Sequence, residues 1–455
     1  MNWDGLQIAA ATGGALHGGA GSSGPIATDT RGALEGAWFL AIRGERFDAH
    51  TFAAQAAAAG CVGGVFSAPV EGFPLPQVVV ADTTRALQDL GRAARDRIRV
   101  PVVGLTGSAG KTTTRGLIAA ALAQLGRRRG TAVHQTTGNL NNHLGVPMTL
   151  LAAPEDAAAV VVEMGTSGPG EIAVLADIAR PDARLIVNIG EAHLEELGGL
   201  EGVAREKGAL FDASRDEDVL AVNLDDPFVR AMAGRGRRVT WGTAEGADIR
   251  LVDVSVDAAS LTTIGTWDTP AGRLRAELGA PGRHIAHNAA GALAIAFGLG
   301  LDLREAAADL IAFAPVGMRL RRVDLPGGVV AINDAYNANP TSMRASLELL
   351  ASMPGRRIAV LGDMLELGPG EAAFHREIIA LARELGIDRV VGTGPRMLAA
   401  GDGDPWFAED GVSLAARLAS ELTAGDRVLF KGSRGARVER VLEAVAAALA
   451  AKEGA

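Results

Sequence analysis

A short glycine-rich segment between an apolar stretch and a helix constrains this sequence most. Residues 102–106 favour a buried strand, and residues 107–114 read Gly-Ser-Ala-Gly-Lys-Thr-Thr-Thr. Such a loop turns several backbone N–H groups toward one point, and the following helix adds its positive dipole end. The segment predicts an anion site in which Lys111 reaches terminal phosphates and the Thr112 hydroxyl binds Mg²⁺. The match to the phosphate-loop pattern is not strict, because Leu105 replaces the first glycine; a glycine-rich turn with an unrelated lysine is the alternative.

Length and composition narrow the class of protein. The chain has 455 residues, which predicts about three domains. A net charge of −9 argues against a nucleic-acid partner, and the single cysteine, Cys61, excludes a disulfide framework and a cysteine metal cluster. The longest apolar run, residues 289–301, is too short for membrane insertion, and the N-terminus lacks the basic region of a secretory signal. We therefore expect a cytoplasmic protein.

Strands alternating with helices predict an α/β fold with mostly parallel sheets. We place domains at 1–99 (small and α/β), 100–315 (a central phosphate-loop ATPase type) and 316–455 (Rossmann-like and doubly wound). Residues 8–24 read as weakly structured, whereas residues 238–278 alternate as β-strands do.

Polar residues follow several predicted strands of the central region. Glu163 ends a buried strand, where it could bind Mg²⁺ or merely cap the strand edge. His193 follows the next strand at the same sheet edge, which favours a ligand over a structural role. Lys207 lies on a predicted helix, 203–211, and its neighbours favour a solvated side chain. Asn288 stands at a predicted helix start, 289–298, where it could simply be a cap.

Polar clusters also mark the two ends of the chain. The segment 28–31, Thr-Asp-Thr-Arg, could hold a ligand at a strand end or form a turn. Near the C-terminus, Lys431 and Arg434 could hold an anion or be exposed loop charges.

Together these segments resemble the Mur ligase family of peptidoglycan amide ligases, over essentially the whole chain. The resemblance is carried by Thr-Asp-Thr-Arg at 28–31, Arg-Gly-Glu-Arg-Phe-Asp-Ala-His at 43–50, Thr-Gly-Ser-Ala-Gly-Lys-Thr-Thr-Thr at 106–114, Gly-Asn-Leu-Asn-Asn-His at 138–143, Glu-Met-Gly at 163–165, Asn-Ile-Gly-Glu-Ala-His at 188–193 and Lys-Gly at 207–208. Three later segments separate this sequence from sister ligases: Asn-Asp-Ala-Tyr-Asn-Ala-Asn-Pro at 333–340, Leu-Gly-Asp-Met-Leu-Glu-Leu-Gly at 361–368 and Lys-Gly-Ser-Arg-Gly-Ala-Arg at 431–437.

The resemblance implies a role for each matching residue. The catalytic group would be Lys111, Glu163, His193 and Lys207. ATP would be bound by Gly107, Ser108, Ala109, Gly110, Lys111, Thr112, Thr113, Asn288, Arg319 and Asp334. Mg²⁺ would be held by Thr112, Glu163, His193 and Lys207, the last as a carbamate formed with CO₂. The UDP-sugar would contact Thr28, Asp29, Arg31, Asp48 and His50, and the incoming dipeptide would lie near Asn337 and Asn339.

The activity implied by the resemblance is ATP-dependent addition of D-alanyl-D-alanine to a UDP-N-acetylmuramoyl-tripeptide, through an acyl phosphate, in cytoplasmic peptidoglycan precursor synthesis by a monomer. Three alternatives stay open. They are another Mur-type or folylpolyglutamate-type ligase that adds one amino acid, an ATPase switch with a phosphate loop, and a non-catalytic sugar-nucleotide binding protein. The last would not need Lys111, Glu163, His193 and Lys207 together.

Overall fold

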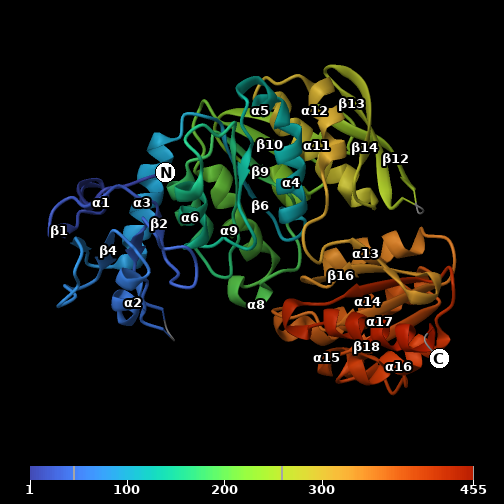
Figure 1. Cartoon of the computed structure of the whole chain (residues 1–455). Helices are drawn as coiled ribbons and strands as arrows, with labels where there is room; N and C mark the ends of the chain where they lie inside the picture. The colour runs from blue at the N-terminus through green and yellow to red at the C-terminus, as the bar shows by residue number, and fades with distance from the viewer. Residues whose placement is uncertain (45–46, 258–259, 454–455) are drawn as a thin grey trace. The chain divides into compact units, whose positions relative to one another are not determined.

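The computed structural model describes residues 1–44, 47–257 and 260–453. Helices cover three β-sheets, which confirms the predicted α/β class (Figure 1). The described chain groups into two compact units. The first contains Met1–Leu105, Leu125–Thr166 and Gly170–Ala183, and the second contains Thr106–Gln124, Ser167–Pro169 and Arg184–Ala455.

The first unit begins with a five-stranded sheet in the order β1-β5-β4-β3-β2, parallel except for β1. Its elements are α1 (Gly5–Thr12), β1 (Ala15–His17), β2 (Ile26–Ala27), β3 (Trp38–Leu40), η1 (Ala49–Phe52), α2 (Ala53–Ala58), β4 (Gly63–Phe66), β5 (Gln77–Val79) and α3 (Thr83–Arg97). The prediction of weak structure over residues 8–24 is wrong for α1, because Asp4 and Gln7 form a capping box that starts this helix.

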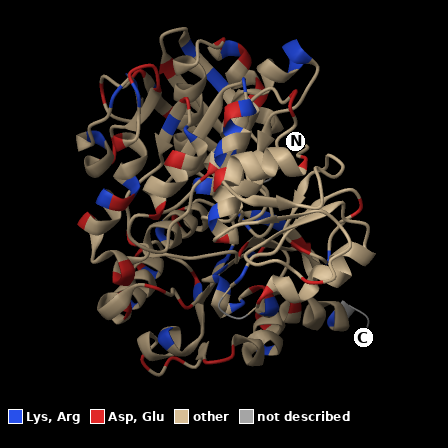
Figure 2. Cartoon of the chain, turned by 90° about the vertical axis from the view of Figure 1, so that its left-hand side faces the viewer, with Lys and Arg blue, Asp and Glu red and all other residues tan. Residues whose placement is uncertain are grey.

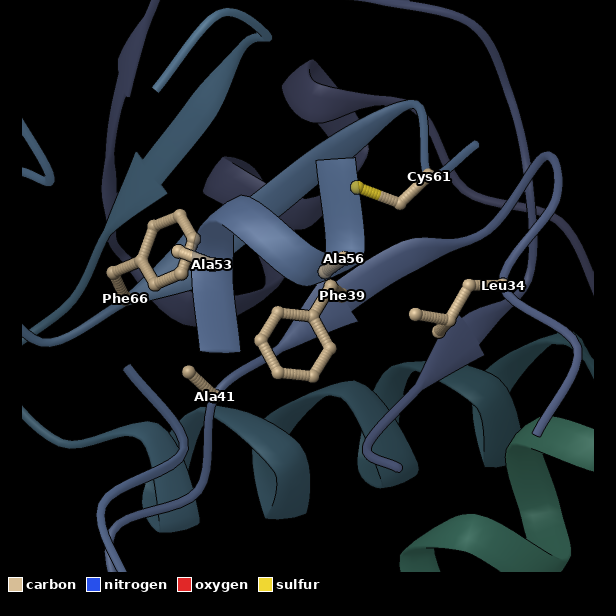
Figure 3. Packing of buried hydrophobic residues seen from close by; sticks show 7 residues of the cluster. All are labelled: Leu34, Phe39, Ala41, Ala53, Ala56, Cys61 and Phe66. Carbon is tan, nitrogen blue, oxygen red and sulfur yellow. The ribbon is translucent and has the colours of Figure 1, made fainter. Parts of the chain in front are cut away.

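One face of this sheet carries a compact apolar cluster. Phe39 and Phe66 pack edge to face, with ring centroids 6.4 Å apart. Cys61 lies buried in the same cluster, and burial raises the pKa of its thiol (Figure 3). A buried cysteine in an apolar setting acts as a small hydrophobic residue.

The central sheet has nine strands in the order β14-β13-β12-β11-β10-β9-β6-β8-β7. Strands β12, β13 and β14 pair antiparallel, so the expected β-rich excursion over 238–278 is present. The strands are β6 (Val102–Thr106), β7 (His134–Gln135), β8 (Val160–Glu163), β9 (Ala183–Ile186), β10 (Val219–Asn223), β11 (Arg237–Gly242), β12 (Ile249–Asp257), β13 (Thr262–Thr269) and β14 (Gly272–Leu278). The helices are α4 (Lys111–Ala121), α5 (Ala123–Arg129), α6 (Gly145–Ala152), α7 (Glu171–Ala179), α8 (Leu194–Leu197), α9 (Leu200–Asp212), α10 (Pro227–Ala231), α11 (Arg283–Gly298), α12 (Leu303–Asp309) and η2 (Leu310–Ala312).

A six-stranded sheet, ordered β15-β16-β20-β17-β18-β19, completes the second unit. All its pairs are parallel except β15 with β16, as expected for a doubly wound sheet. Its strands are β15 (Arg321–Leu325), β16 (Val329–Asp334), β17 (Arg357–Gly362), β18 (Arg389–Thr393), β19 (Phe407–Ala408) and β20 (Arg427–Lys431). Its helices are η3 (Pro326–Gly328), α13 (Pro340–Ala351), η4 (Gly368–Gly370), α14 (Glu371–Glu384), α15 (Pro395–Ala400), η5 (Gly411–Leu414), α16 (Ala415–Glu421), η6 (Arg434–Ala436) and α17 (Glu439–Glu453).

Among the described residues, no helix has both the length and the apolar character needed to cross a membrane. Positive and negative residues are interspersed along the ribbon in the side view (Figure 2).

Candidate functional site

The glycine-rich loop connects the end of β6 to the start of α4. The helix begins at Lys111, with Gly110 as its N-cap at a φ of 77°. A Cβ on Gly110 would lie 2.8 Å from Nδ2 of Asn288. Both the left-handed backbone and this close approach therefore require glycine.

Asn288 occupies a different place in its helix from the one predicted. Helix α11 begins at Arg283, after the N-cap Gly282, so Asn288 lies in the helix interior and cannot be a cap. The polar segment 283–288, which the prediction places before the helix, forms its first turns. Since α11 packs beside α4, Asn288 faces the glycine-rich loop.

The segment that follows β9 holds the loop in shape. The amide of Ala109 donates to Oδ1 of Asn188 at 2.9 Å, and the Ser108 hydroxyl donates to the carbonyl of Gly190 at 3.0 Å. The Ser108 amide also donates to the Asn188 carbonyl at 3.1 Å. Asn188 is thus a supporting residue that the predicted site set omits, although its place after a buried strand was a visible signal.

Lys111 and Lys207, beside this loop, are close enough for their charges to interact. The Lys111 ammonium donates to the Gly107 carbonyl at 2.6 Å. Lys207 is 1% exposed, and burial, reinforced by the charge of Lys111, lowers its pKa well below the usual value. The expectation of a solvated Lys207 is therefore wrong. It shares the buried face of α9 with Val203, Leu210 and Phe211, which follow helical spacing.

His193 and Glu366 meet in the second unit. His193 is the N-cap residue of α8, at a φ of 55°, and its Nδ1 lies 2.7 Å from Oε2 of Glu366. This contact with His193 lowers the pKa of the Glu366 carboxyl. Glu366 is absent from the predicted site, although its segment carries the family resemblance.

Glu163 belongs to the first unit and is buried at the end of β8. Its carboxylate accepts a hydrogen bond from Asn141 Nδ2 at 2.9 Å, and its amide donates to the Thr136 hydroxyl at 3.0 Å. These bonds fix a buried carboxylate on a strand end, as the sequence predicts.

The expected Mg²⁺ ligands fit a metal that the nucleotide helps to hold. Among the residues described, no three His, Cys, Asp or Glu side chains gather as a ready metal site. Mg²⁺ characteristically uses one or two protein carboxylates, retained waters and substrate phosphates instead of a full protein cage. Of the expected ligands, Glu163 supplies a carboxylate of that kind and Thr112 adds a hydroxyl oxygen, whereas the His193 imidazole offers a nitrogen donor.

The predicted UDP-sugar residues lie in the first unit. Asp48 accepts hydrogen bonds from Arg43 and from the His50 amide, which lower its pKa to about 2. His50 Nε2 accepts the Ser67 amide proton at 2.8 Å, so the ring proton of neutral His50 sits on Nδ1, 2.6 Å from Asp48.

The remaining residues of this group are less constrained. Asp29 and Arg31 form an exposed pair, and Arg31 holds the pKa of Asp29 at about 2. The Thr28 hydroxyl lies 3.8 Å from the Met148 sulfur. Glu45 and Arg46, within the segment 43–50, lie outside the described residues.

The predicted residues of the C-terminal region are partly engaged with one another. Asp334 is buried and accepts from Lys431 at 2.5 Å and from the Ser346 hydroxyl at 2.8 Å. Lys431 is therefore a buried ion-pair partner, not an exposed loop charge. Arg434 is exposed and pairs with Glu439.

Aromatic and amide contacts complete that set. The Arg319 guanidinium stacks on the Tyr336 ring, 3.6 Å from the centroid. Asn339 caps α13 and also donates from Nδ2 to the Ser108 carbonyl at 3.2 Å, so it reaches the glycine-rich loop. Asn337 is exposed, and its Oδ1 accepts the Ala338 amide.

A cavity of about 500 Å³ lies at the start of α11. Its apolar wall includes Leu251 and Val254 of β12 and Leu349 of α13, and its polar wall includes His284 and His287. Burial lowers the pKa of His284 to about 4, so its imidazole is neutral at neutral pH. None of the predicted site residues lines this cavity, but Asn288 follows His284 by one helical turn.

Two family patterns match the chain. Residues 105–296 match the Mur ligase middle domain, and residues 318–434 match the Mur ligase, glutamate ligase domain. The chain belongs to the Mur ligase family. It is 38% identical to the UDP-N-acetylmuramoyl-tripeptide–D-alanyl-D-alanine ligase of Bacillus subtilis, and the match covers 92% of both proteins.

Solved Mur ligase structures have the same fold. MurF from Acinetobacter baumannii superposes with a TM-score of 0.90 at 33% identity, covering 98% of this chain and 99% of that one. MurF ligase from Thermotoga maritima, in complex with ADP, superposes with a TM-score of 0.83 at 29% identity, covering 94% and 98%.

Proposed function

We propose that this chain is an ATP-dependent carboxylate–amine ligase that adds D-alanyl-D-alanine to UDP-N-acetylmuramoyl-tripeptide, releasing ADP and phosphate. The observation that carries the proposal is the glycine-rich loop 107–113 at the N-terminus of α4. The charge of Lys111, on the same helix, helps to lower the pKa of the buried Lys207. Relatives named for this reaction, which match over nearly the full chain, support the choice of substrates.

The reaction proceeds in two steps. The terminal carboxylate of the tripeptide attacks the γ-phosphorus, and the bond to the ADP oxygen breaks, giving an acyl phosphate. The amine of D-alanyl-D-alanine then attacks the acyl carbon, loses a proton and displaces phosphate. Loop amides and the Lys111 ammonium stabilise the charge that develops on the transferred group. Mg²⁺, when bound through Thr112, Glu163 and His193, would neutralise further phosphate charge.

Lys207 has the environment required for carbamylation. Burial lowers its pKa, so the amine retains the free electron pair that attacks CO₂. Formation of the N–C bond and loss of one proton convert the neutral amine into an anionic carbamate. We propose that this carbamate helps to hold Mg²⁺, in the role the family resemblance gives it.

The remaining site residues are assigned to the UDP-sugar, to the nucleotide and to the dipeptide. The UDP-sugar lies along Thr28, Asp29, Arg31, Asp48 and His50. Adenine enters the cavity beside Asn288, where neutral His284 and apolar walls suit a flat, uncharged base. Arg319 leaves the Tyr336 ring to reach the γ-phosphate, Asp334 holds the ribose, and Asn337 and Asn339 approach the dipeptide.

We also propose the wider setting of this activity. The three sheets support domains at 1–99, 100–315 and 316–455. The enzyme acts as a monomer in the cytoplasm, where it supplies peptidoglycan precursors for cell-wall growth, cell shape and division.

Phosphate release from ATP tests this function directly. UDP-N-acetylmuramoyl-tripeptide and D-alanyl-D-alanine are added singly and together, with the Lys111→Ala protein as the matched control. The proposal expects release only with both, and a pentapeptide product by mass spectrometry. Release with neither substrate would instead indicate an ATPase switch, and release with a single amino acid a sister ligase.

The carbamate has its own test. Lys207→Ala should lower ligation by roughly 100-fold or more, because one charge stabiliser of the transition state is lost. Short carboxylic acids that fill the vacated space should partly restore the rate, whereas short alkylamines should not. Full activity without rescue would remove Lys207 from the site.

A further inference from the structure

His193 and Glu366 both have unusual backbone conformations. Their φ values are 55° and 64°, in the left-handed region that residues other than glycine rarely adopt. Such residues cluster at functional sites, where the surrounding structure holds them. Here the two side chains face each other, with Nδ1 and Oε2 2.7 Å apart.

The Nδ1 atom of His193 contacts the Glu366 carboxylate. The atom is buried, and within the described part of the chain it makes no regular hydrogen bond, although Oε2 of Glu366 lies 2.7 Å away. The Glu366 carboxylate is therefore placed to accept a proton carried by this nitrogen.

Hydrogen bonds hold the backbone of the segment that carries Glu366, which follows the end of β17. The Met364 amide donates to Nε2 of buried His375 at 2.9 Å, and the Leu365 amide donates to the Ser433 hydroxyl at 3.0 Å. Glu366 is thus presented by a fixed backbone. Its side chain is 57% exposed, so the pair adds little to stability and its effect is on orientation.

We propose that Glu366 is a positioning residue that fixes the ring orientation and the tautomer of His193. With the proton held on Nδ1, Nε2 keeps its lone pair and is ready to bind a divalent cation. Metal-binding histidines are commonly oriented by a carboxylate on the other ring nitrogen. The inference rests on the proposed function, because it takes His193 as a ligand of Mg²⁺.

The substitution Glu366→Gly separates positioning from folding. Glycine adopts a positive φ freely, so this variant should melt at or above the wild-type temperature. Mn²⁺ binding in the presence of a non-hydrolysable ATP analogue should weaken by about 10–100-fold, the usual cost of losing such a carboxylate. Asp402→Gly is the matched control, because Asp402 is exposed and has a φ of 50°. It should leave Mn²⁺ affinity unchanged.

A second readout needs neither metal nor activity. In ¹⁵N-histidine-labelled protein, the two ring nitrogens of His193 should report a proton on Nδ1, and Glu366→Gly should shift the population toward Nε2. A His193→Ala sample assigns the signal among the eight histidines. Glu366→Gln keeps an acceptor oxygen and should restore most of the wild-type tautomer.

The outcomes distinguish this inference from the proposed function. If His193→Ala weakens Mn²⁺ binding but Glu366→Gly changes neither Mn²⁺ affinity nor the tautomer, Glu366 has no positioning role. If His193→Ala leaves Mn²⁺ affinity intact, His193 is not a ligand, and both the metal assignment and the inference fail.

Discussion

At the scale of the residue, the buried Lys207 amine should make stability depend on pH. The folded chain holds this amine with a lowered pKa, while the unfolded chain binds a proton below about 10.5. The unfolded state therefore binds more protons, and stability falls as pH drops from 10.5 toward the folded pKa. Lys207→Met should remove this loss and raise the melting temperature at pH 7 in CO₂-free buffer, with the gain shrinking toward pH 10.5. An equal gain at both pH values would contradict a neutral buried amine.

At the scale of the element, the end of β9 supports the glycine-rich loop through one amide side chain. Asn188→Ala would leave the Ala109 amide without its acceptor, a loss of about 1–3 kcal/mol. If this free-energy cost destabilises the loop conformation that binds the nucleotide, ATP affinity drops roughly 5–150-fold. Isothermal titration with a non-hydrolysable ATP analogue measures it.

The neighbouring strand offers a matched control for that substitution. Asn223, at the end of β10, donates from Nδ2 to the Val187 carbonyl at 2.8 Å, and none of its hydrogen bonds to other described residues reaches the glycine-rich loop. Asn223→Ala should cost similar stability in urea while changing ATP affinity much less. Equal affinity losses in the two variants would mean that the loop responds to sheet stability in general.

At the scale of the whole molecule, Gly190 allows helix α13 to pack close to the segment that follows β9, within the second unit. A Cβ on Gly190 would lie 2.5 Å from Oγ1 of Thr341, whose hydroxyl donates to Glu191 at 2.8 Å. Gly190→Ala should therefore lower kcat by keeping helix α13 away, while the KM for the UDP-sugar substrate changes little.

A double substitution tests whether that clash is the cause. Thr341→Ala removes the obstructing oxygen, so Gly190→Ala with Thr341→Ala should recover most of the kcat, and Thr341→Ala alone should have a mild effect. Strict additivity of the two single losses would show that the residues act independently.

The sequence predicted what depends on local pattern. The strand–loop–helix around Lys111, the β-excursion before α11 and the α/β class all follow from periodicity and glycine placement. The prediction of a solvated Lys207 is wrong because its charged neighbours hide its helical spacing with Val203 and Phe211. The predicted helix start at Asn288 is wrong because the polar residues before it belong to the same helix. Glu366 depends on a contact between segments far apart in the chain, which no local pattern encodes.

Cys61 gives this chain a built-in reporter of local unfolding. It is the only cysteine in the sequence, and it is buried in the apolar cluster of the first sheet. A thiol reagent can reach it only when that cluster opens, so the labelling rate measures the free energy of that opening at one defined atom. If the UDP-sugar binds this sheet as proposed, saturating UDP-N-acetylmuramoyl-tripeptide should slow labelling, and ATP alone should not. Thiol chemistry on the unmodified protein would thereby read out substrate binding without any introduced probe.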